Sequence, residues 1–127
     1  MMAGNEIYVA TALGLIFIGF ATVAIKRNLI KMVLGFSIAN IGVNLLIVAL
    51  GWAPGRTAPI IDDPALLADT TTLAVRTSAV VDPVPQAIVL TAIVIGVGTT
   101  ALMLAYAIRL YATSGTLDVN HFGRLKW

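Results

Sequence analysis

The sequence contains no cysteine and very little charge. Of its 127 residues, 8 are lysine or arginine and 6 are aspartate or glutamate, so charged residues make up 11% of the chain. Soluble domains are about 25% charged, because a surface that faces water needs polar side chains. Without cysteine, the chain can form no disulfide, no iron–sulfur cluster and no Cys-based zinc site. These absences exclude a soluble globular domain of the usual kind.

Catalytic and metal-binding patterns are also missing. The single histidine, His121, lies near the C-terminus, and the sequence has no glycine-rich phosphate-binding loop between a strand and a helix. A net charge of +2 is too small for a nucleic-acid-binding patch. We therefore predict that the chain is not an enzyme on its own, and that it binds neither a metal ion nor nucleic acid.

What the sequence does contain is apolar: 59% of the residues are hydrophobic. Three uncharged runs each reach the roughly 20 residues that a helix needs to cross a bilayer. Backbone polar groups cannot stay unpaired in lipid, so each run predicts a helix. The predicted fold class is an all-α membrane protein forming a single domain, residues 1–127. Its transmembrane helices are predicted at residues 7–25, 30–52 and 85–109, with a loop at 53–84.

The placement of the basic residues predicts how these helices are oriented. They gather in the turn between the first two runs and around the end of the third: Lys26, Arg27, Lys31, Arg109, Arg124 and Lys126. The positive-inside rule therefore places that turn and the C-terminus in the cytoplasm, and the N-terminus and the 53–84 loop outside. Because the basic residues follow the first run, we expect a retained span rather than a cleaved signal peptide.

The 53–84 loop is long for a connection between two helices. Within it, residues 64–75 predict a short helix that lies on the outer surface or on a partner. At its end, Asp82 is expected to cap the third helix, with Pro85 in the first turn.

Polar residues within the apolar runs are the candidate functional residues. Ser37, Asn40 and Asn44 are spaced i, i+3, i+7, which places them on one face of the second helix. The third run has a small, polar stretch formed by Thr91, Gly96, Gly98, Thr99 and Thr100, of which Thr91 and Gly96 are the candidates. Such residues either join helices through close contacts and hydrogen bonds, or hold waters along a path for protons or a cation. Asparagine does not titrate, so a relay of ionisable groups is not expected here.

Two further features bear on partners. Lys31 is the charge nearest to a span, and it either marks the cytoplasmic mouth of an ion path or extends to the membrane surface. Gly35 and Gly42 leave room for a partner helix. Three helices enclose almost no interior, so we expect either several copies of the chain or a place in a larger membrane complex.

Long stretches of the sequence resemble the C subunit of the multisubunit Mrp-type sodium/proton antiporters. These stretches are RNLIKMVLGFSIANIGVNLLIVALG at Arg27–Gly51, DPVPQAIVLTAIVIGVGTTAL at Asp82–Leu102 and GTLDV at Gly115–Val119. That protein is similar to the small NuoK-type subunit of respiratory complex I, a module that also occurs in membrane-bound hydrogenases and sulfur-reducing complexes. The complex I family has one glutamate in the second span and one in the third. Ser37 and Gly96 occupy the matching positions here, so the resemblance carries no proton-relay role to this chain.

The resemblance implies a non-catalytic, multi-pass subunit of a monovalent cation/proton antiporter in a prokaryotic plasma membrane. It implies larger antiporter-like partner subunits that carry the titratable lysines and glutamates, and no ATP or redox cofactor on this chain. The alternative is a membrane-arm subunit of an ion-pumping hydrogenase, sulfur reductase or complex I-like enzyme. A third possibility, a homo-oligomeric channel, is disfavoured because no apolar run contains a carboxylate.

Overall fold

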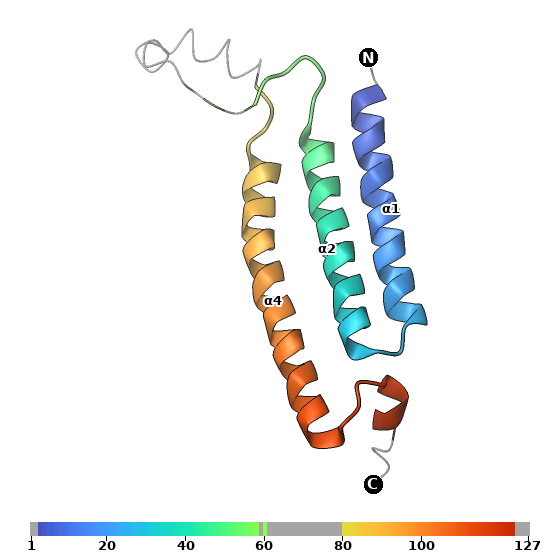
Figure 1. Cartoon of the computed structure of the whole chain (residues 1–127). Coiled ribbons are helices and arrows are strands. Elements are labelled where there is room, and N and C mark those ends of the chain that lie inside the picture. Colours follow the sequence, from blue (N-terminus) through green and yellow to red (C-terminus); the bar gives the residue numbers. More distant parts are fainter. Residues whose placement is uncertain (1–2, 59, 61–79, 124–127) are drawn as a thin grey trace.

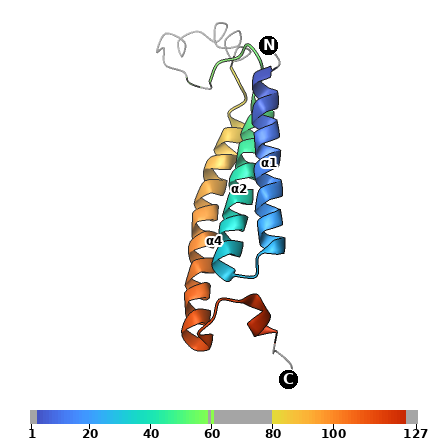
Figure 2. The same ribbon diagram turned by 45° about the vertical axis from the view of Figure 1, so that its right-hand side comes forward.

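The computed structural model describes residues 3–58, 60 and 80–123. Its helices are α1 (Ala3–Ile25), α2 (Leu29–Gly51), α4 (Val84–Ser114) and the short 3₁₀ helix η2 (Val119–Phe122). The three long helices stand side by side, and α2 lies between α1 and α4 and packs against both (Figures 1 and 2). The described residues contain no strand, only two isolated β-bridges. The predicted all-α class is confirmed.

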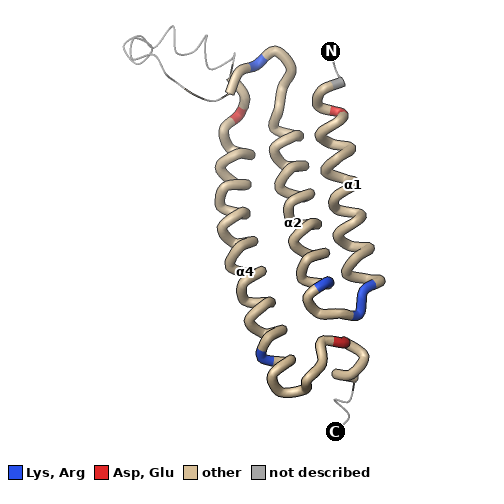
Figure 3. Tube along the Cα trace, in the orientation of Figure 1, with Lys and Arg blue, Asp and Glu red and all other residues tan. Residues whose placement is uncertain are grey.

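All three long helices are long and apolar enough to cross a membrane. Large apolar side chains project from the outer helices into open space; Phe17 on α1 and Val94 on α4, for example, are 73% and 69% exposed. Figure 3 shows that the charged residues of the described segments lie at or beyond the two ends of the long helices, and that the helical stretch between is uncharged. This surface suits lipid or other apolar helices rather than water. The three-helix membrane prediction is confirmed, and its orientation stays a prediction.

Two helices extend beyond the predicted apolar runs. α1 begins at Ala3 rather than at residue 7, and α4 continues to Ser114 rather than ending at 109. The 31 residues of α4 rise about 46 Å, more than the roughly 30 Å of a hydrocarbon core. α4 is therefore longer than the apolar layer is thick, and it ends only where Gly115 adopts the left-handed conformation, with φ of 69°.

The helix starts follow local sequence signals. The Asn28 side chain caps α2 and accepts hydrogen bonds from the backbone N–H groups of Ile30 and Lys31. At α4, the N-cap position is Pro83, which forms no side-chain cap bond, so the prediction that Asp82 is the cap is wrong by one residue. Asp82 comes just before it, and its carboxylate oxygen accepts from the Val84 N–H at 3.0 Å. The predicted short helix at residues 64–75 lies outside the described residues.

Small residues set the distance between α1 and α2. A Cβ atom added at Gly19 would lie 2.5 Å from the Ala39 backbone nitrogen and 2.6 Å from the Gly35 carbonyl oxygen. A Cβ added at Gly42 would lie 2.9 Å from the Ala12 carbonyl oxygen. The two backbones therefore touch, as small residues allow in membrane helix pairs. The helix that approaches Gly35 and Gly42 is the chain's own α1.

The segment after α4 folds back onto the turn between α1 and α2. The Leu29 N–H donates to the Leu117 carbonyl at 3.0 Å, and the Val119 N–H donates to the Arg27 carbonyl at 2.8 Å. These two bonds form the antiparallel bridge between Asn28 and Asp118. The GTLDV stretch thus closes one end of the helical layer (Figure 1).

Candidate functional site

The candidate site is a polar interface between α2 and α4, formed by Ser37, Asn40 and Asn44 with Gly96 and Thr100. At its first contact, the hydroxyl oxygens of Ser37 and Thr100 lie 3.2 Å apart. The Ser37 hydroxyl also lies 3.0 Å from the Val33 carbonyl, to which it donates. Because serine has one hydroxyl proton, Thr100 is the donor in the contact between the helices.

The second contact joins Asn40 and Gly96. A Cβ atom added at Gly96 would collide with the side-chain nitrogen of Asn40. The amide of Asn40 therefore lies directly on the α4 backbone, in space that only a glycine leaves open.

Asn44 completes the polar face of α2. Asn44 is 9% exposed, and among the described residues it is the one polar residue that is buried. Close approaches pair Ser37 with Thr100, Asn40 with Gly96 and Gly51 with Pro85 along the antiparallel helices. This register places Asn44 opposite α4 near Ala92, on the same side of α2 as Ser37 and Asn40.

The other two candidates lie outside this interface. Thr91 is exposed on α4, and its hydroxyl donates to the Ala87 carbonyl of the same helix at 3.3 Å. Lys31 lies in the first turn of α2, with its side chain exposed at the end of the bundle. The structure thus brings Ser37, Asn40 and Asn44 together with Gly96, and leaves Thr91 and Lys31 apart from them.

Thr100 belongs to the small, polar stretch of the third run, but it was not among the candidate site residues predicted from the sequence. Gly96 and Thr100 are four residues apart, so they share one helical face, whereas Thr91 is turned away from it. That spacing was available in the sequence. The sequence did not show which face of α4 packs against α2.

The chemistry of the interface is neutral. Its side chains are hydroxyls and amides, which donate and accept hydrogen bonds without changing charge. Within the described part of the chain, no three His, Cys, Asp or Glu side chains gather as a metal site. The interface can hold helices together or orient water, and it contains no group that takes up and releases a proton near neutral pH.

Gly96→Val should destabilise the helix pair, by about 1–3 kcal/mol, because the added methyl groups meet Asn40. Gly98→Val is the matched control, since a Cβ there has no atom within 4 Å. Thermal unfolding in detergent measures both, and Asn40→Ala should restore part of the stability of the Gly96 variant. Equal losses in the two glycine variants would contradict the contact.

Comparison with known proteins identifies the family. The family model of NADH-ubiquinone/plastoquinone oxidoreductase chain 4L matches residues 7–127. The chain belongs to this family. Among relatives, it is 32% identical over 115 residues to the C subunit of the Na⁺/H⁺ antiporter of Bacillus subtilis (strain 168), a match that covers 91% of both chains. It is 34% identical over 96 residues to the C1 subunit of the Na⁺/H⁺ antiporter of Staphylococcus epidermidis, covering 76% of this chain and 73% of that protein.

Two solved membrane complexes contain similar chains. One is the membrane-bound sulfane sulfur reductase, an archaeal respiratory complex, with 46% identity, a TM-score of 0.75, and coverage of 89% of this chain and 94% of that chain. The other is the Mrp complex from Dietzia sp. DQ12-45-1b, with 31% identity, a TM-score of 0.61, and coverage of 87% and 73%. The resemblance to the antiporter C subunit and to the small complex I subunit is confirmed.

The family resemblance bears on two positions of the polar interface, 37 and 96. The resemblance places the two glutamates of the complex I subunit at positions 37 and 96. Both positions face the α2–α4 contact, where Ser37 meets Thr100 and Gly96 meets Asn40. At these two places the chain therefore has uncharged contacts between its own helices.

Proposed function

We propose that this chain is a non-catalytic integral subunit of a multisubunit Na⁺/H⁺ antiporter in the plasma membrane. The observation that carries the proposal is the 32% identity to an antiporter C subunit over 91% of both chains. In this role the larger antiporter-like subunits hold the titratable groups, and the chain binds no cofactor. It acts as one domain with its N-terminus outside and its C-terminus in the cytoplasm.

The open faces of α1 and α4 support a place between larger subunits. In the most apolar 18-residue stretch of α1 and of α4, only 11% is buried within the chain, whereas 28% of the corresponding stretch of α2 is buried. Helices in a membrane associate through packing and hydrogen bonds between such faces. We infer that α2 with its polar interface is the internal support, and that α1 and α4 present the surfaces on which neighbours and lipid pack.

The polar interface keeps α2 and α4 in register in this proposal. Ser37, Asn40 and Asn44 with Gly96 fix the helix pair, which then shapes one wall of an ion path at the contact with a larger subunit. Thr91, on the exposed side of α4, faces such a neighbour, and Lys31 lies at the cytoplasmic mouth of that path. The burial of Asn44 favours the helix-contact role over direct contact with water.

A specific observation favours a second candidate. The identity to the chain of the sulfane sulfur reductase, 46%, exceeds that to the Mrp complex chain, 31%. In that alternative the chain is a membrane-arm subunit of a respiratory enzyme that couples redox chemistry to ion movement.

Deletion of the chain from its host, followed by transport in everted vesicles, tests the proposal. Addition of sodium should collapse a preformed proton gradient in wild-type vesicles and fail to do so in the deletion strain, with recovery on complementation. Large antiporter-like subunits should co-purify with the tagged chain. Normal exchange without the chain would contradict the proposal, and co-purification of redox subunits would favour the second candidate.

Ser37→Glu should produce no gain of transport. The new carboxyl group would lie between α2 and α4, and the described interface contains no ionisable partner that could pass a proton to it or take one from it. Sodium-dependent collapse of the proton gradient should be at or below the wild-type rate, with Ser37→Thr as a control that keeps the hydroxyl. A faster rate would show that the position accepts a relay role.

Orientation is testable because the chain has no cysteine of its own. A cysteine introduced at Ala58 should react with a membrane-impermeant maleimide added to intact cells, because the positive-inside rule places that end outside. A cysteine at Thr113, in the last turn of α4, should react only after permeabilisation. The opposite labelling pattern would reverse the assigned orientation.

A further inference from the structure

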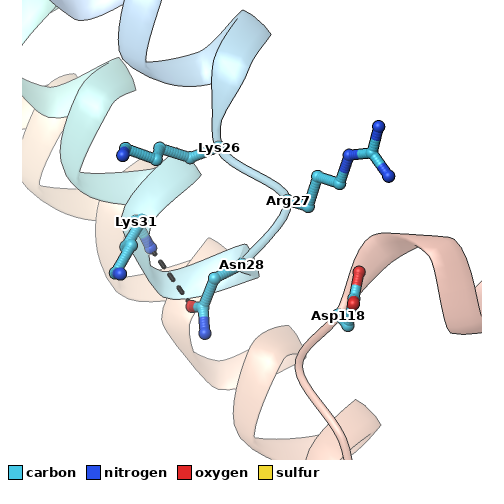
Figure 4. A pocket seen from close by; sticks show the side chains of 5 residues that line it. All are labelled: Lys26, Arg27, Asn28, Lys31 and Asp118. Atoms are coloured by element: carbon cyan, nitrogen blue, oxygen red, sulfur yellow. Dashed lines mark hydrogen bonds between the residues drawn. The ribbon is translucent and has the colours of Figure 1, made fainter.

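A basic pocket lies where the α1–α2 turn meets the segment after α4. Its volume is about 270 Å³, and Figure 4 shows the side chains that line it: Lys26, Arg27, Asn28, Lys31 and Asp118. Three basic residues and one carboxylate thus line the pocket. Figure 4 also shows the Arg27 guanidinium pointing away from Asp118. The pocket therefore has an excess of positive charge.

Most backbone donors around the pocket already have partners. Asn28 accepts from the N–H groups of Ile30 and Lys31 at 3.0 and 3.5 Å, and the Leu29 N–H donates to Leu117. We therefore expect an anion in this pocket to be held by the lysine side chains rather than by these backbone groups.

Among the residues that the structure describes, Asp118 is the one carboxylate that lines the pocket, against three basic side chains. One Asp118 oxygen accepts from the backbone N–H and the side-chain amide of Asn120, at 3.0 and 3.1 Å. Lys31 lies in the first turn of α2, at the positive end of the helix dipole, which disfavours a cation. A bound anion would relieve the repulsion among the three basic side chains and the helix end.

The position of the pocket at the ends of the membrane helices indicates which kind of anion it binds. α1 ends at Ile25 and α2 begins at Leu29, so the pocket lies where the apolar spans end and lipid phosphates lie. The adjacent side chains of Ile25 and Ile30 are 70% and 41% exposed and offer an apolar surface to an acyl chain. Basic pockets at the cytoplasmic ends of membrane helices recognise anionic lipid headgroups.

We propose that this pocket binds the phosphate of an anionic phospholipid in the cytoplasmic leaflet. Lys26 and Lys31 hold the phosphate, Arg27 adds long-range attraction, and the acyl chains lie along the apolar surface at the ends of α1 and α2. The segment after α4 forms one wall, so a bound lipid also stabilises the bridge that closes this end of the layer. The proposal holds whichever transport or respiratory complex contains the chain.

Titration of phosphatidylglycerol into phosphatidylcholine nanodiscs that contain the assembled complex tests the proposal, with bound lipid counted by native mass spectrometry. The double variant Lys26→Gln/Lys31→Gln should bind the lipid about thirtyfold more weakly, because each basic residue near a membrane surface contributes about fivefold. Asp118→Asn keeps the acceptor oxygen and removes the opposing charge, so it should strengthen binding about fivefold. Lys26→Arg/Lys31→Arg should bind like wild type.

Arg109→Gln is the matched control, since it removes one basic residue of α4 that does not line the pocket. An equal loss per charge in this variant would mean general attraction to the membrane and would overturn the proposal. Inorganic phosphate added to discs of phosphatidylcholine alone separates the two sources of phosphate: tight binding of phosphate without enrichment of phosphatidylglycerol would overturn the lipid assignment. A pocket occupied by an acidic segment of another subunit, seen as lysine–carboxylate cross-links and no retained lipid, would overturn it as well.

Discussion

Gly19→Leu is expected to separate α1 from α2 and to lower strongly the amount of folded chain that accumulates in the membrane. Even the first atom of the new side chain would lie 2.5–2.6 Å from Ala39 and Gly35. Two of the atoms that it meets are a backbone nitrogen and a carbonyl oxygen, which cannot rotate aside as a side chain can. Relief of the clash requires a shift of the whole of α1, so we expect a cost of at least about 3 kcal/mol.

The measurement is the amount of chain in washed membranes together with its unfolding temperature in detergent. Gly14→Leu is the matched control, because it makes the same substitution on the same helix at a glycine whose added Cβ has no atom within 4 Å. We expect the control to accumulate near the wild-type level. Similar accumulation of both variants would show that α1 and α2 tolerate a wider separation than the structure has.

Asn44→Leu is expected to cause the second largest effect, on both assembly and exchange. Asn44 is 9% exposed and faces α4, so leucine adds volume to a packed contact and removes a polar group from it. Overpacking of a packed contact costs about 1–3 kcal/mol. A cost near 2 kcal/mol corresponds to roughly a thirtyfold loss of correctly packed helix pair.

Two readouts on one preparation measure this prediction: the yield of assembled complex, and sodium-dependent collapse of a proton gradient in vesicles. Thr11→Leu serves as control, because it also places leucine at a polar position within a span but on the exposed side of α1, away from the α2–α4 contact. We expect that variant to retain most of the yield. An Asn44→Leu complex that assembles and exchanges sodium normally would show that the amide has no role in the contact.

The uncharged α2–α4 interface bears on how ions move in a complex of this kind. Positions 37 and 96 hold carboxylates in the complex I subunit that the chain resembles, and here they hold a serine and a glycine that contact Thr100 and Asn40. Hydroxyl and amide side chains neither take up nor release protons near neutral pH, so these residues cannot relay protons themselves. The pH dependence of transport should therefore originate in the larger subunits, while this chain contributes the position and the spacing of its helices.

Much of the architecture follows from the sequence alone. Long apolar runs without charge form helices in a membrane, because lipid offers no hydrogen-bond partners to unpaired backbone N–H and C=O groups. Local signals determine where helices begin, as the hydrogen bonds of Asn28 and Asp82 show. The spacing of Ser37, Asn40 and Asn44 determines that they share a face of α2, since helical geometry depends only on residue separation.

Only the tertiary structure decided which helix each face meets. Gly35 and Gly42 pack on α1 and the polar face packs on α4, a choice that depends on long-range contacts absent from any local pattern. For the same reason Thr100 joins the interface while Thr91, a residue of the same type, does not. The return of the GTLDV stretch to the α1–α2 turn brings together segments about ninety residues apart in sequence. Residue type and spacing therefore determined what each helix could offer, and the packing of α2 between its neighbours decided what each residue contacts.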